Sequence, residues 1–299
     1  MIRAVVAGSA GAMGRLLVDH LLAEKVRLTG IDQKPHAPNN QFTSLQADIT
    51  GASGEVKSAI AGADCVLLCL PEEVAIASVP VLRQTMAAGA LLVETLSVKL
   101  PFAHHAATFG EQIEVLGINP MFAPDLGFAG QKVAVVKTRS GPRTEWFLKM
   151  MSRWGAETSL VTAEEHDRIA ADVQGLTHAA ILAFGLALSK LQYTPESAAR
   201  MLTPPHRTLL SLLARIVLGE PQVYWDVQKS NVMSEDARRA LAASVEEIKA
   251  IIESGDRERF IAVFQEIGRM LQPDLAALGS NAAELFRAQM PAKGHAKPA

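Results

Sequence analysis

A run of small residues early in the chain has the composition of a phosphate-binding turn. It reads Gly8-Ser9-Ala10-Gly11-Ala12-Met13-Gly14 and lies between an apolar segment and a helix-periodic segment that begins near Arg15. Glycines permit a tight turn and let backbone amides approach a pyrophosphate at a helix N-terminus. The strict glycine pattern requires glycine at position 9, where this chain has Ser9. A purely structural glycine turn is therefore the alternative interpretation.

An acidic residue after the second apolar segment favours a dinucleotide site. Asp32 lies 18 residues beyond Gly14, a spacing typical of the carboxylate that binds a ribose 2′-hydroxyl. That carboxylate repels the 2′-phosphate of NADP, although neighbouring Lys34 could weaken the discrimination. We therefore predict an NAD site, and its predicted residues are Gly8, Ser9, Gly11, Met13, Gly14 and Asp32.

Two polar pairs in the second half could bind an anionic substrate. Arg207 and Arg215 are separated by about two helical turns, so a helix places them near one face. Guanidinium groups bind carboxylates through paired hydrogen bonds, although surface arginines without a ligand are the alternative. Gln174 and His178 have the i, i+4 spacing of one helix face.

No group of Cys, His and carboxylate residues has metal-ligand spacing, so we predict no metal site.

The first half of the chain alternates short β-rich runs with helical stretches, a pattern typical of a parallel, doubly wound sheet. The runs that we interpret as buried strands are 2–7, 26–31, 65–70, 90–94, 114–118 and 132–136. The glycine turn follows the first of these strands, and Asp32 ends the second. This is the placement that a Rossmann-type dinucleotide domain requires.

The second half has the periodicity of helices. Apolar residues recur at helical spacing through 163–191, 205–218, 235–253 and 257–278. Thr162 and Glu165 form a capping box where this pattern begins. We predict an α/β fold class, with an N-terminal doubly wound Rossmann-type domain over residues 1–162, an all-α domain over 163–290 and a flexible tail over 291–299.

Composition limits the partners and the compartment. Of the 299 residues, 49% are hydrophobic, which suffices for the cores of about two domains. A formal net charge of -2 leaves no basic excess for binding nucleic acid. Cys65 and Cys69 lie in one apolar run, where an extended strand keeps them apart, so a reducing cytoplasm fits. The apolar run 179–188 is about half a membrane span, so we expect a cytoplasmic protein with a small-molecule ligand and no membrane partner.

Four motifs together resemble one enzyme family. Leu96-Ser97-Val98-Lys99 follows the fourth strand, and Gly117-Ile118-Asn119-Pro120 lies at the end of the fifth. Glu165-His166-Asp167 begins the long helix, and Gln174-Gly175-Leu176-Thr177-His178 follows it. In this order and spacing the chain resembles the prephenate dehydrogenase (cyclohexadienyl dehydrogenase) family as far as about residue 231. We expect His166 and Asp167 to form hydrogen bonds at the helix end and at the domain interface, and we do not assign them to catalysis.

The resemblance implies a reaction and roles for residues. Members oxidatively decarboxylate a cyclohexadienyl acid to an aromatic product with NAD(P). The resemblance implies that Arg207 and Arg215 hold the carboxylates of the substrate, a cyclohexadienyl dicarboxylate. It also implies that His178 contacts the ring carboxylate with Gln174 beside it, and that Ser97 contacts the 4-substituent. It further implies a homodimer through the C-terminal helices, and a mean hydropathy of +0.16 fits apolar surface buried between subunits.

One residue departs from the family pattern. The family's Gly-x-His-Pro motif has a histidine that accepts the proton of the ring 4-hydroxyl, and this chain has Asn119 there. An amide accepts a hydrogen bond but takes up no proton near neutral pH. An amine at ring carbon 4 removes that need, since its lone pair can drive hydride departure. The family that the chain resembles includes enzymes acting on 4-amino-4-deoxyprephenate. The resemblance therefore implies that Ser97 and Asn119 are the catalytic residues for its NAD-dependent conversion to 4-aminophenylpyruvate.

Other interpretations stay open. A prephenate or arogenate dehydrogenase of tyrosine biosynthesis could use water as the base, at a loss of about 10²–10⁴-fold in rate. A non-catalytic NAD-binding protein would also lack the histidine, but the retained Ser97, Arg207, Arg215 and His178 argue against it. A β-hydroxyacid dehydrogenase needs a lysine within 167–188, and that stretch has none. The motifs do not distinguish a pyruvyl from an alanyl side chain on the substrate.

Overall fold

The computed structural model describes residues 1–35, 41–51 and 53–289. The tail that the sequence predicts over 291–299 lies outside these residues. The described chain forms two compact units, and the chain passes between them more than once. The first unit comprises Met1–Val173 and Gln222–Ser234, and the second comprises Gln174–Pro221 and the described residues from Glu235 onward.

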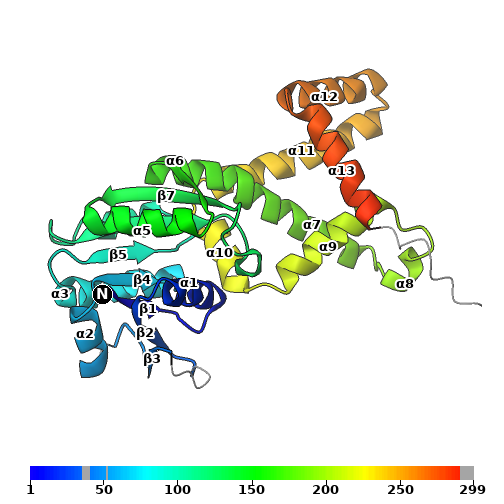
Figure 1. The fold of residues 1–299 in the computed structure, drawn as a ribbon. Coiled ribbons are helices and arrows are strands. Elements are labelled where there is room, and N and C mark those ends of the chain that lie inside the picture. The colour runs from blue at the N-terminus through cyan, green and yellow to red at the C-terminus, as the bar shows by residue number, and fades with distance from the viewer. Residues whose placement is uncertain (36–40, 52, 290–299) are drawn as a thin grey trace, which may run out of the picture. The chain divides into compact units, whose positions relative to one another are not determined.

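The first unit is built on one mixed sheet (Figure 1). Within the described residues its strands are β1 (Arg3–Ala7), β2 (Arg27–Asp32), β3 (Thr43–Gln46), β4 (Cys65–Leu68), β5 (Leu91–Glu94), β6 (Glu114–Pro120), β7 (Lys132–Arg139) and β8 (Glu157–Leu160). Their spatial order is β3-β2-β1-β4-β5-β6-β7-β8. The order reverses between β1 and β4, which is the switch point of a doubly wound fold. The predicted Rossmann-type class is therefore confirmed.

Strand β7 departs from the parallel arrangement predicted for the sheet. It runs antiparallel to β6, whereas the other neighbouring pairs are parallel. The segment between Pro120 and Lys132 contains only one short 3₁₀ turn, η1 (Pro124–Leu126). A parallel crossover needs about a dozen or more residues, usually with a helix. The short connection therefore returns the chain beside β6 in the opposite direction.

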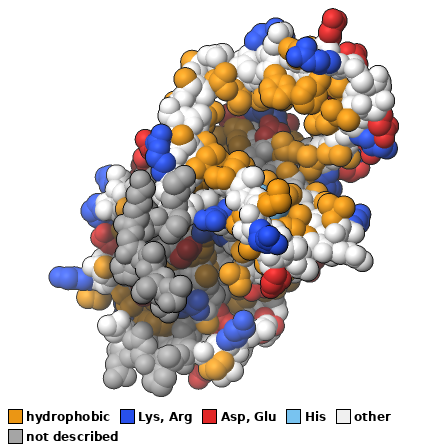
Figure 2. Space-filling model, turned by 90° about the vertical axis from the view of Figure 1, so that its right-hand side faces the viewer, with side chains coloured by type: hydrophobic (Ala, Val, Ile, Leu, Met, Phe, Trp, Pro, Cys, Tyr) orange, Lys and Arg blue, Asp and Glu red, His pale blue; other side chains and the backbone are white. Residues whose placement is uncertain are grey.

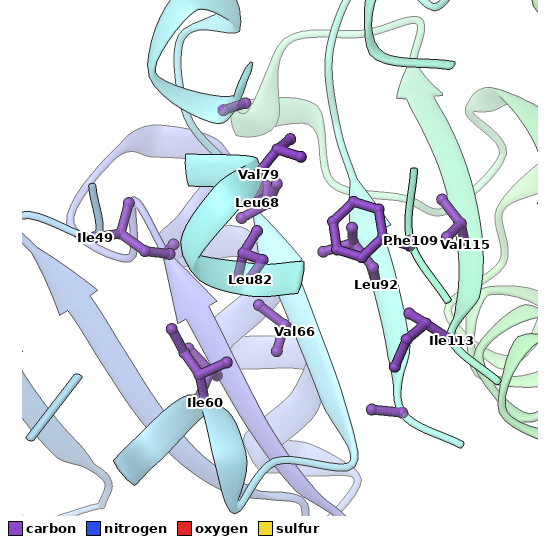
Figure 3. Packing of buried hydrophobic residues seen from close by; sticks show 14 of the residues in the cluster. Ile49, Ile60, Val66, Leu68, Val79, Leu82, Leu92, Phe109, Ile113 and Val115 are labelled. Atoms are coloured by element: carbon purple, nitrogen blue, oxygen red, sulfur yellow. The ribbon is translucent and has the colours of Figure 1, made fainter. Parts of the chain in front are cut away.

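Helices cover both faces of the sheet because alternate strand residues point to opposite sides. On one face, Val66 and Leu68 of β4 pack with Ile60 of α2 (Gly54–Ala61) and Leu82 of α3 (Glu72–Thr85), as Figure 3 shows. On the other face, Leu67 lies in a separate cluster with residues of α1 (Ala12–Ala23) and α5 (Pro142–Arg153). These buried strands read as continuous apolar runs, which is why the sequence predicts them well.

The two edge strands are absent from the sequence prediction. β3 has the sequence TSLQ and β8 has the sequence ETSL, and most of their residues are exposed. An edge strand pairs on one side only and needs no apolar run. Hydrophobic pattern therefore carries little information about them.

The second unit is helical in the residues described. Its helices are α7 (Thr177–Lys190), α8 (Pro195–Ala198), α9 (Pro204–Val217), α11 (Ser234–Ser254), α12 (Arg257–Met270) and α13 (Leu275–Ala288). The prediction of a single helix over 257–278 is wrong. Pro273 lies between α12 and α13, and it lacks the amide hydrogen that would continue the helix. A further helix, α10 (Pro221–Lys229), was not predicted and lies almost entirely in the first unit.

The helical stretch 163–190 is interrupted and strongly apolar. It comprises α6 (Ala163–Ala170), a π-helical turn η2 (Ala171–Leu176) and α7. By length and composition alone, this is a stretch among the described residues that could cross a membrane. Ile181 is the buried residue of α7, so most of that helix is left partly or fully exposed in one chain.

Candidate active site

The glycine loop joins β1 to α1 in a conformation that requires its glycines. Gly8 has φ +80°, and a Cβ there would lie 2.0 Å from the carbonyl oxygen of Cys69. A Cβ at Gly14 would lie 2.0 Å from the carbonyl oxygen of Gly8. The first turn of α1 therefore packs directly on the loop. This close approach is the role of the last glycine in a dinucleotide-binding turn.

Ser9 is accommodated in the loop because its neighbour on β2 has no side chain. Ser9 is fully buried, and its amide donates to the carbonyl oxygen of Ile31 at 3.4 Å. A Cβ at Gly30 would lie 2.7 Å from Ser9 Oγ. Gly30 thus supplies the space that a serine needs at position 9.

The carboxylate of Asp32 holds the loop from the end of β2. Its Oδ2 accepts from the amide of Ala10 at 2.9 Å, and its Oδ1 accepts from the amide of Lys34 at 2.9 Å. Gly11 caps α1 without a side-chain hydrogen bond, and the first turn of α1 has no acidic residue. The helix N-terminus therefore keeps a positive end that suits the pyrophosphate of a dinucleotide.

Ser97 lies three residues after the end of β5, and Asn119 lies in the last two residues of the neighbouring strand β6, at the same edge of the sheet. β5 and β6 are parallel, with Glu94 paired to Gly117, so the residues after them lie at the carboxyl edge together. Ser97 is half-buried and Asn119 is 2% exposed. The glycine loop also follows a carboxyl end, that of β1. Ligands of open α/β sheets bind at this edge.

A buried ion pair lies beneath this edge. Lys99 Nζ donates to Glu94 Oε2 at 2.7 Å and to the carbonyl oxygen of Ile118 at 2.7 Å. Burial lowers the pKa of Lys99 and raises that of Glu94, while their mutual attraction opposes both shifts. A Cβ at Gly117 would lie 2.2 Å from Glu94 Oε1, so glycine is required for the pair to fit. The pair fixes the backbone immediately before Asn119.

The structure brings His166 and Asp167 to Asn119. Asn119 Nδ2 lies 3.0 Å from His166 Nε2, and His166 Nδ1 lies 2.7 Å from Asp167 Oδ1. Burial is the main cause that lowers the pKa of His166, with Asp167 opposing it. The imidazole is therefore neutral near pH 7. The sequence prediction gives His166 and Asp167 no role at this site. The Glu165-His166-Asp167 motif of the family is the sequence feature that could have indicated one.

Asp167 also makes the helix-end hydrogen bonds that were expected of this motif. Its Oδ1 accepts from the amide of Lys99 at 2.8 Å, and its Oδ2 accepts from the amide of Leu100 at 2.9 Å. These amides begin α4 (Leu100–Ala106). Asn231 Nδ2 donates to the backbone carbonyl of Asp167 at 2.6 Å. The Asp167 carboxylate is thus fixed by backbone amides about 67 residues away in the chain, and the local periodicity of apolar residues cannot predict such contacts.

Gln174 and His178 lie in the second unit, the first within a helix irregularity and the second just after it. Gln174 belongs to η2 and His178 to α7, and both are half-buried. A π-helical turn is wider than an α-helical one, so the i, i+4 argument for a shared face does not hold strictly here. Burial lowers the pKa of His178, which makes it a neutral hydrogen-bonding group near pH 7. Such turns occur often at functional sites.

The two arginines of α9 differ in their surroundings. Arg207 Nη1 donates to the carbonyl oxygen of Gln289 at 2.9 Å, at the end of α13. Arg215 lies in the last turn of α9, where a cation is favoured by the helix dipole. Both residues are exposed. Arg207 therefore has a structural contact that its predicted role did not include.

Comparisons with known proteins give a consistent result. Residues 162–266 match the family described as "Prephenate dehydrogenase, dimerization domain". The chain is 37% identical over 286 residues to the 4-amino-4-deoxyprephenate dehydrogenase of Streptomyces pristinaespiralis, covering 96% of this chain and 97% of that relative. It is 27% identical to the probable arogenate/prephenate dehydrogenase of Methanocaldococcus jannaschii, covering 69% of this chain and 47% of that protein.

A solved structure shares the fold. Prephenate dehydrogenase from A. aeolicus, crystallised with hydroxyphenyl propionate and NAD+, gives a TM-score of 0.72 at 19% identity. The match covers 90% of this chain and 98% of that chain. At this identity the likeness concerns the fold.

The fold and the glycine loop define a dinucleotide-binding protein with a Rossmann-type unit and a helical unit. The similarity over nearly the whole length of one relative goes further. The chain belongs to the prephenate dehydrogenase family. The match to the dimerization domain begins at residue 162, beside the predicted boundary, whereas the first compact unit extends to Val173.

Proposed function

We propose that the chain catalyses the NAD-dependent oxidative decarboxylation of 4-amino-4-deoxyprephenate to 4-aminophenylpyruvate. The observation that carries this proposal is the buried Asn119 amide at the carboxyl end of β6, where the family motif has a histidine. The relative at 37% identity bears the name of this activity. Prephenate or arogenate oxidation is the second candidate, because the relative at 27% identity bears those names.

The proposed chemistry fits an amide at position 119. The neutral amine lone pair forms a C=N bond as the hydride leaves ring carbon 4. The electrons of the bond to the carbon 1 carboxylate then flow into the ring and return to nitrogen, and carbon dioxide leaves. No protein group has to remove a proton during hydride departure. Asn119 and Ser97 have only to orient the substituent by hydrogen bonds.

NAD is the cofactor that the first unit suits. The bound nicotinamide would accept the hydride. Gly8, Gly11 and Gly14 allow the loop to approach the pyrophosphate, and the uncapped N-terminus of α1 supplies amide donors. Asp32, at the end of β2, would accept hydrogen bonds from the ribose hydroxyls. Ser9 and Met13 complete the proposed contacts.

The remaining assignments concern substrate and assembly. Gln174, His178, Arg207 and Arg215 stay the proposed ligands of the substrate's carboxylates, with Arg215 the stronger candidate. We propose a homodimer through the C-terminal helices, since the matched family segment is described as a dimerization domain. A cytoplasmic location is part of the proposal, because the cysteines of the described chain are free thiols.

Steady-state kinetics test the proposal directly. Initial rates should be measured with 4-amino-4-deoxyprephenate, prephenate and arogenate, each with NAD and NADP. We expect the highest kcat/KM for the amino substrate with NAD, and activity that rises with pH as the ammonium form loses its proton. A kcat/KM for NADP equal to that for NAD would contradict the role of Asp32. Faster turnover of prephenate would favour the second candidate.

A further inference from the structure

We propose that His166, held by Asp167, is a positioning residue that orients the Asn119 amide so that its oxygen serves the 4-substituent of the substrate. The orientation follows from the geometry of three side chains within the first unit. Only the identity of the group that meets the amide oxygen rests on the proposed function.

The hydrogen-bond roles can be assigned from the carboxylate outward. A carboxylate only accepts hydrogen bonds, so the 2.7 Å contact with Asp167 Oδ1 places the proton of His166 on Nδ1. The neutral imidazole then carries a lone pair on Nε2. The atom 3.0 Å away on Asn119 must be a donor, which is Nδ2 of the amide. A flipped amide would set its oxygen against that lone pair.

The His166 and Asp167 side chains have little freedom to rearrange. Asp167 accepts from the amides of Lys99 and Leu100 through its two oxygens, and His166 and Asp167 are 3% and 1% exposed. The Lys99 ammonium, bound to Glu94, is the charged group that acts on His166 besides Asp167. Since it is a cation, it further disfavours the imidazolium. The neutral Nδ1–H form is thus imposed by the surroundings.

The fixed orientation has a chemical consequence. With the NH₂ group bound to His166, the oxygen occupies the opposite side of the Asn119 amide. An amide oxygen attracts an N–H whose nitrogen gains positive charge during hydride departure. That hydrogen bond is stronger in the transition state than in the ground state, so it raises kcat rather than lowering KM alone. The same oxygen cannot take the proton that a 4-hydroxyl has to lose.

Two substitutions of His166 separate positioning from mere packing. His166→Leu removes the acceptor for Asn119, whereas His166→Gln puts an amide oxygen close to the position of Nε2. For the amino substrate we expect His166→Leu to lower kcat about 10- to 100-fold, with little change in the KM for NAD. We expect His166→Gln to keep kcat within about threefold of the wild type. Equal losses in both variants would overturn the proposal.

A double-substitution cycle tests whether His166 acts through Asn119. In an Asn119→Ala background, His166→Leu should lower kcat by less than about twofold, because the amide to be oriented is gone. A full, additive loss in that background would mean that His166 acts independently of Asn119 and would refute the inference. The thermal unfolding midpoint of each variant should be measured beside kcat to exclude loss of folded protein.

The state of the imidazole can be measured without any substrate. Nitrogen-15 NMR of histidine-labelled protein should show His166 neutral at pH 7, with its proton on Nδ1 and with a pKa lower than that of an ordinary histidine. A protonated ring or the Nε2–H form at pH 7 would overturn the inference. If instead the NMR result holds and the amino substrate is not turned over, the proposed function fails while the orientation of Asn119 stands.

Discussion

At the scale of single residues, the chemistry of the candidate site depends on which titratable side chains are uncharged near pH 7. Burial lowers the pKa of His166 and of His178, so both imidazoles serve as neutral hydrogen-bonding groups near pH 7. Lys99 and Glu94, two buried charges at the carboxyl edge, are paired with each other. Removing one member of such a pair is expected to cost about 3–5 kcal/mol, since the other charge stays buried. We therefore expect the charge that binds a dicarboxylate to come from Arg207 and Arg215, which are exposed.

Arg215→Ala should raise KM for the substrate at least about tenfold while leaving KM for NAD and the unfolding midpoint nearly unchanged. Arg215 is exposed, so its loss creates no cavity in the core. The matched control is Arg239→Ala, since Arg239 is exposed and forms ion pairs with Glu235 and Asp236 of its own helix. An unchanged KM for every candidate acid would remove Arg215 from the site.

The sequence predicts the residues of this site better than their contacts. Spacing relative to buried apolar runs predicts the glycine loop and Asp32, whereas the family resemblance predicts Ser97 and Asn119. The contact between Asn119 and His166 joins residues 47 apart in the chain. Local periodicity has no information about such a pair. The partner of Arg207 at Gln289 was missed for the same reason.

At the scale of elements, the prediction succeeds where burial imposes a pattern. β1, β4 and β5 are apolar runs in the centre of the sheet, and the predicted ranges contain them. β3 and β8 lie at the edges and escape detection. The break between α12 and α13 was missed because the apolar period continues across Pro273. Within 163–191 the apolar pattern also does not reveal the π-helical turn, since apolar residues recur on both sides of it.

The packing of α10 on α3 produces a carboxyl group that opposes folding when ionised. The amide of Glu72 donates to Asp226 Oδ2 at 3.4 Å, and burial, the main cause, raises the pKa of Glu72 to about 7. Among the described residues, Glu72 Oε2 has no hydrogen-bond partner. A pKa that is higher in the folded state than in the unfolded state means that stability falls as pH rises from about 4.5 to about 7.

Glu72→Gln should therefore stabilise the first unit above pH 7 and not below pH 4.5. We expect a gain of about 1–3 kcal/mol at pH 8, since glutamine cannot ionise. Urea unfolding followed at pH 4.5 and pH 8 measures the difference. Glu73→Gln is the control, because Glu73 neighbours Glu72 on α3 but is exposed. A gain of the same size at both pH values would show that ionisation is not the cause.

At the scale of the whole molecule, many apolar side chains of the helical unit are exposed in a single chain. Side chains that repeat along one stripe of each helix are exposed on α11, α12 and α13, and they include Val245, Ile248, Ile252, Ile261, Phe264, Ile267, Leu275 and Leu278. Figure 2 shows apolar side chains gathered on the upper part of this face, at the height of these helices in Figure 1. Contiguous exposed apolar patches mark interaction surfaces, which supports the proposed homodimer.

Phe264→Asp should convert the dimer to a monomer or weaken it at least about 100-fold, because it places a charge in a desolvated contact. Phe264 is 65% exposed in the single chain, so the monomer itself should stay folded. Sedimentation velocity over a range of micromolar concentrations measures the effect. Gln265→Asp, which adds the same charge one position away, is the control. A wild-type protein that sediments as a monomer would refute the dimer outright.

We propose that Asn119 selects an amine at ring carbon 4, and the ratio of kcat/KM for 4-amino-4-deoxyprephenate to that for prephenate tests this selection most directly. The ratio should be measured in wild type and in Asn119→His under NAD saturation. We predict that the wild type favours the amino substrate, and that the substitution speeds prephenate oxidation at least about 100-fold by restoring a proton acceptor without helping the amino substrate. A wild type that oxidises prephenate faster, with a ratio unchanged in Asn119→His, would contradict the account.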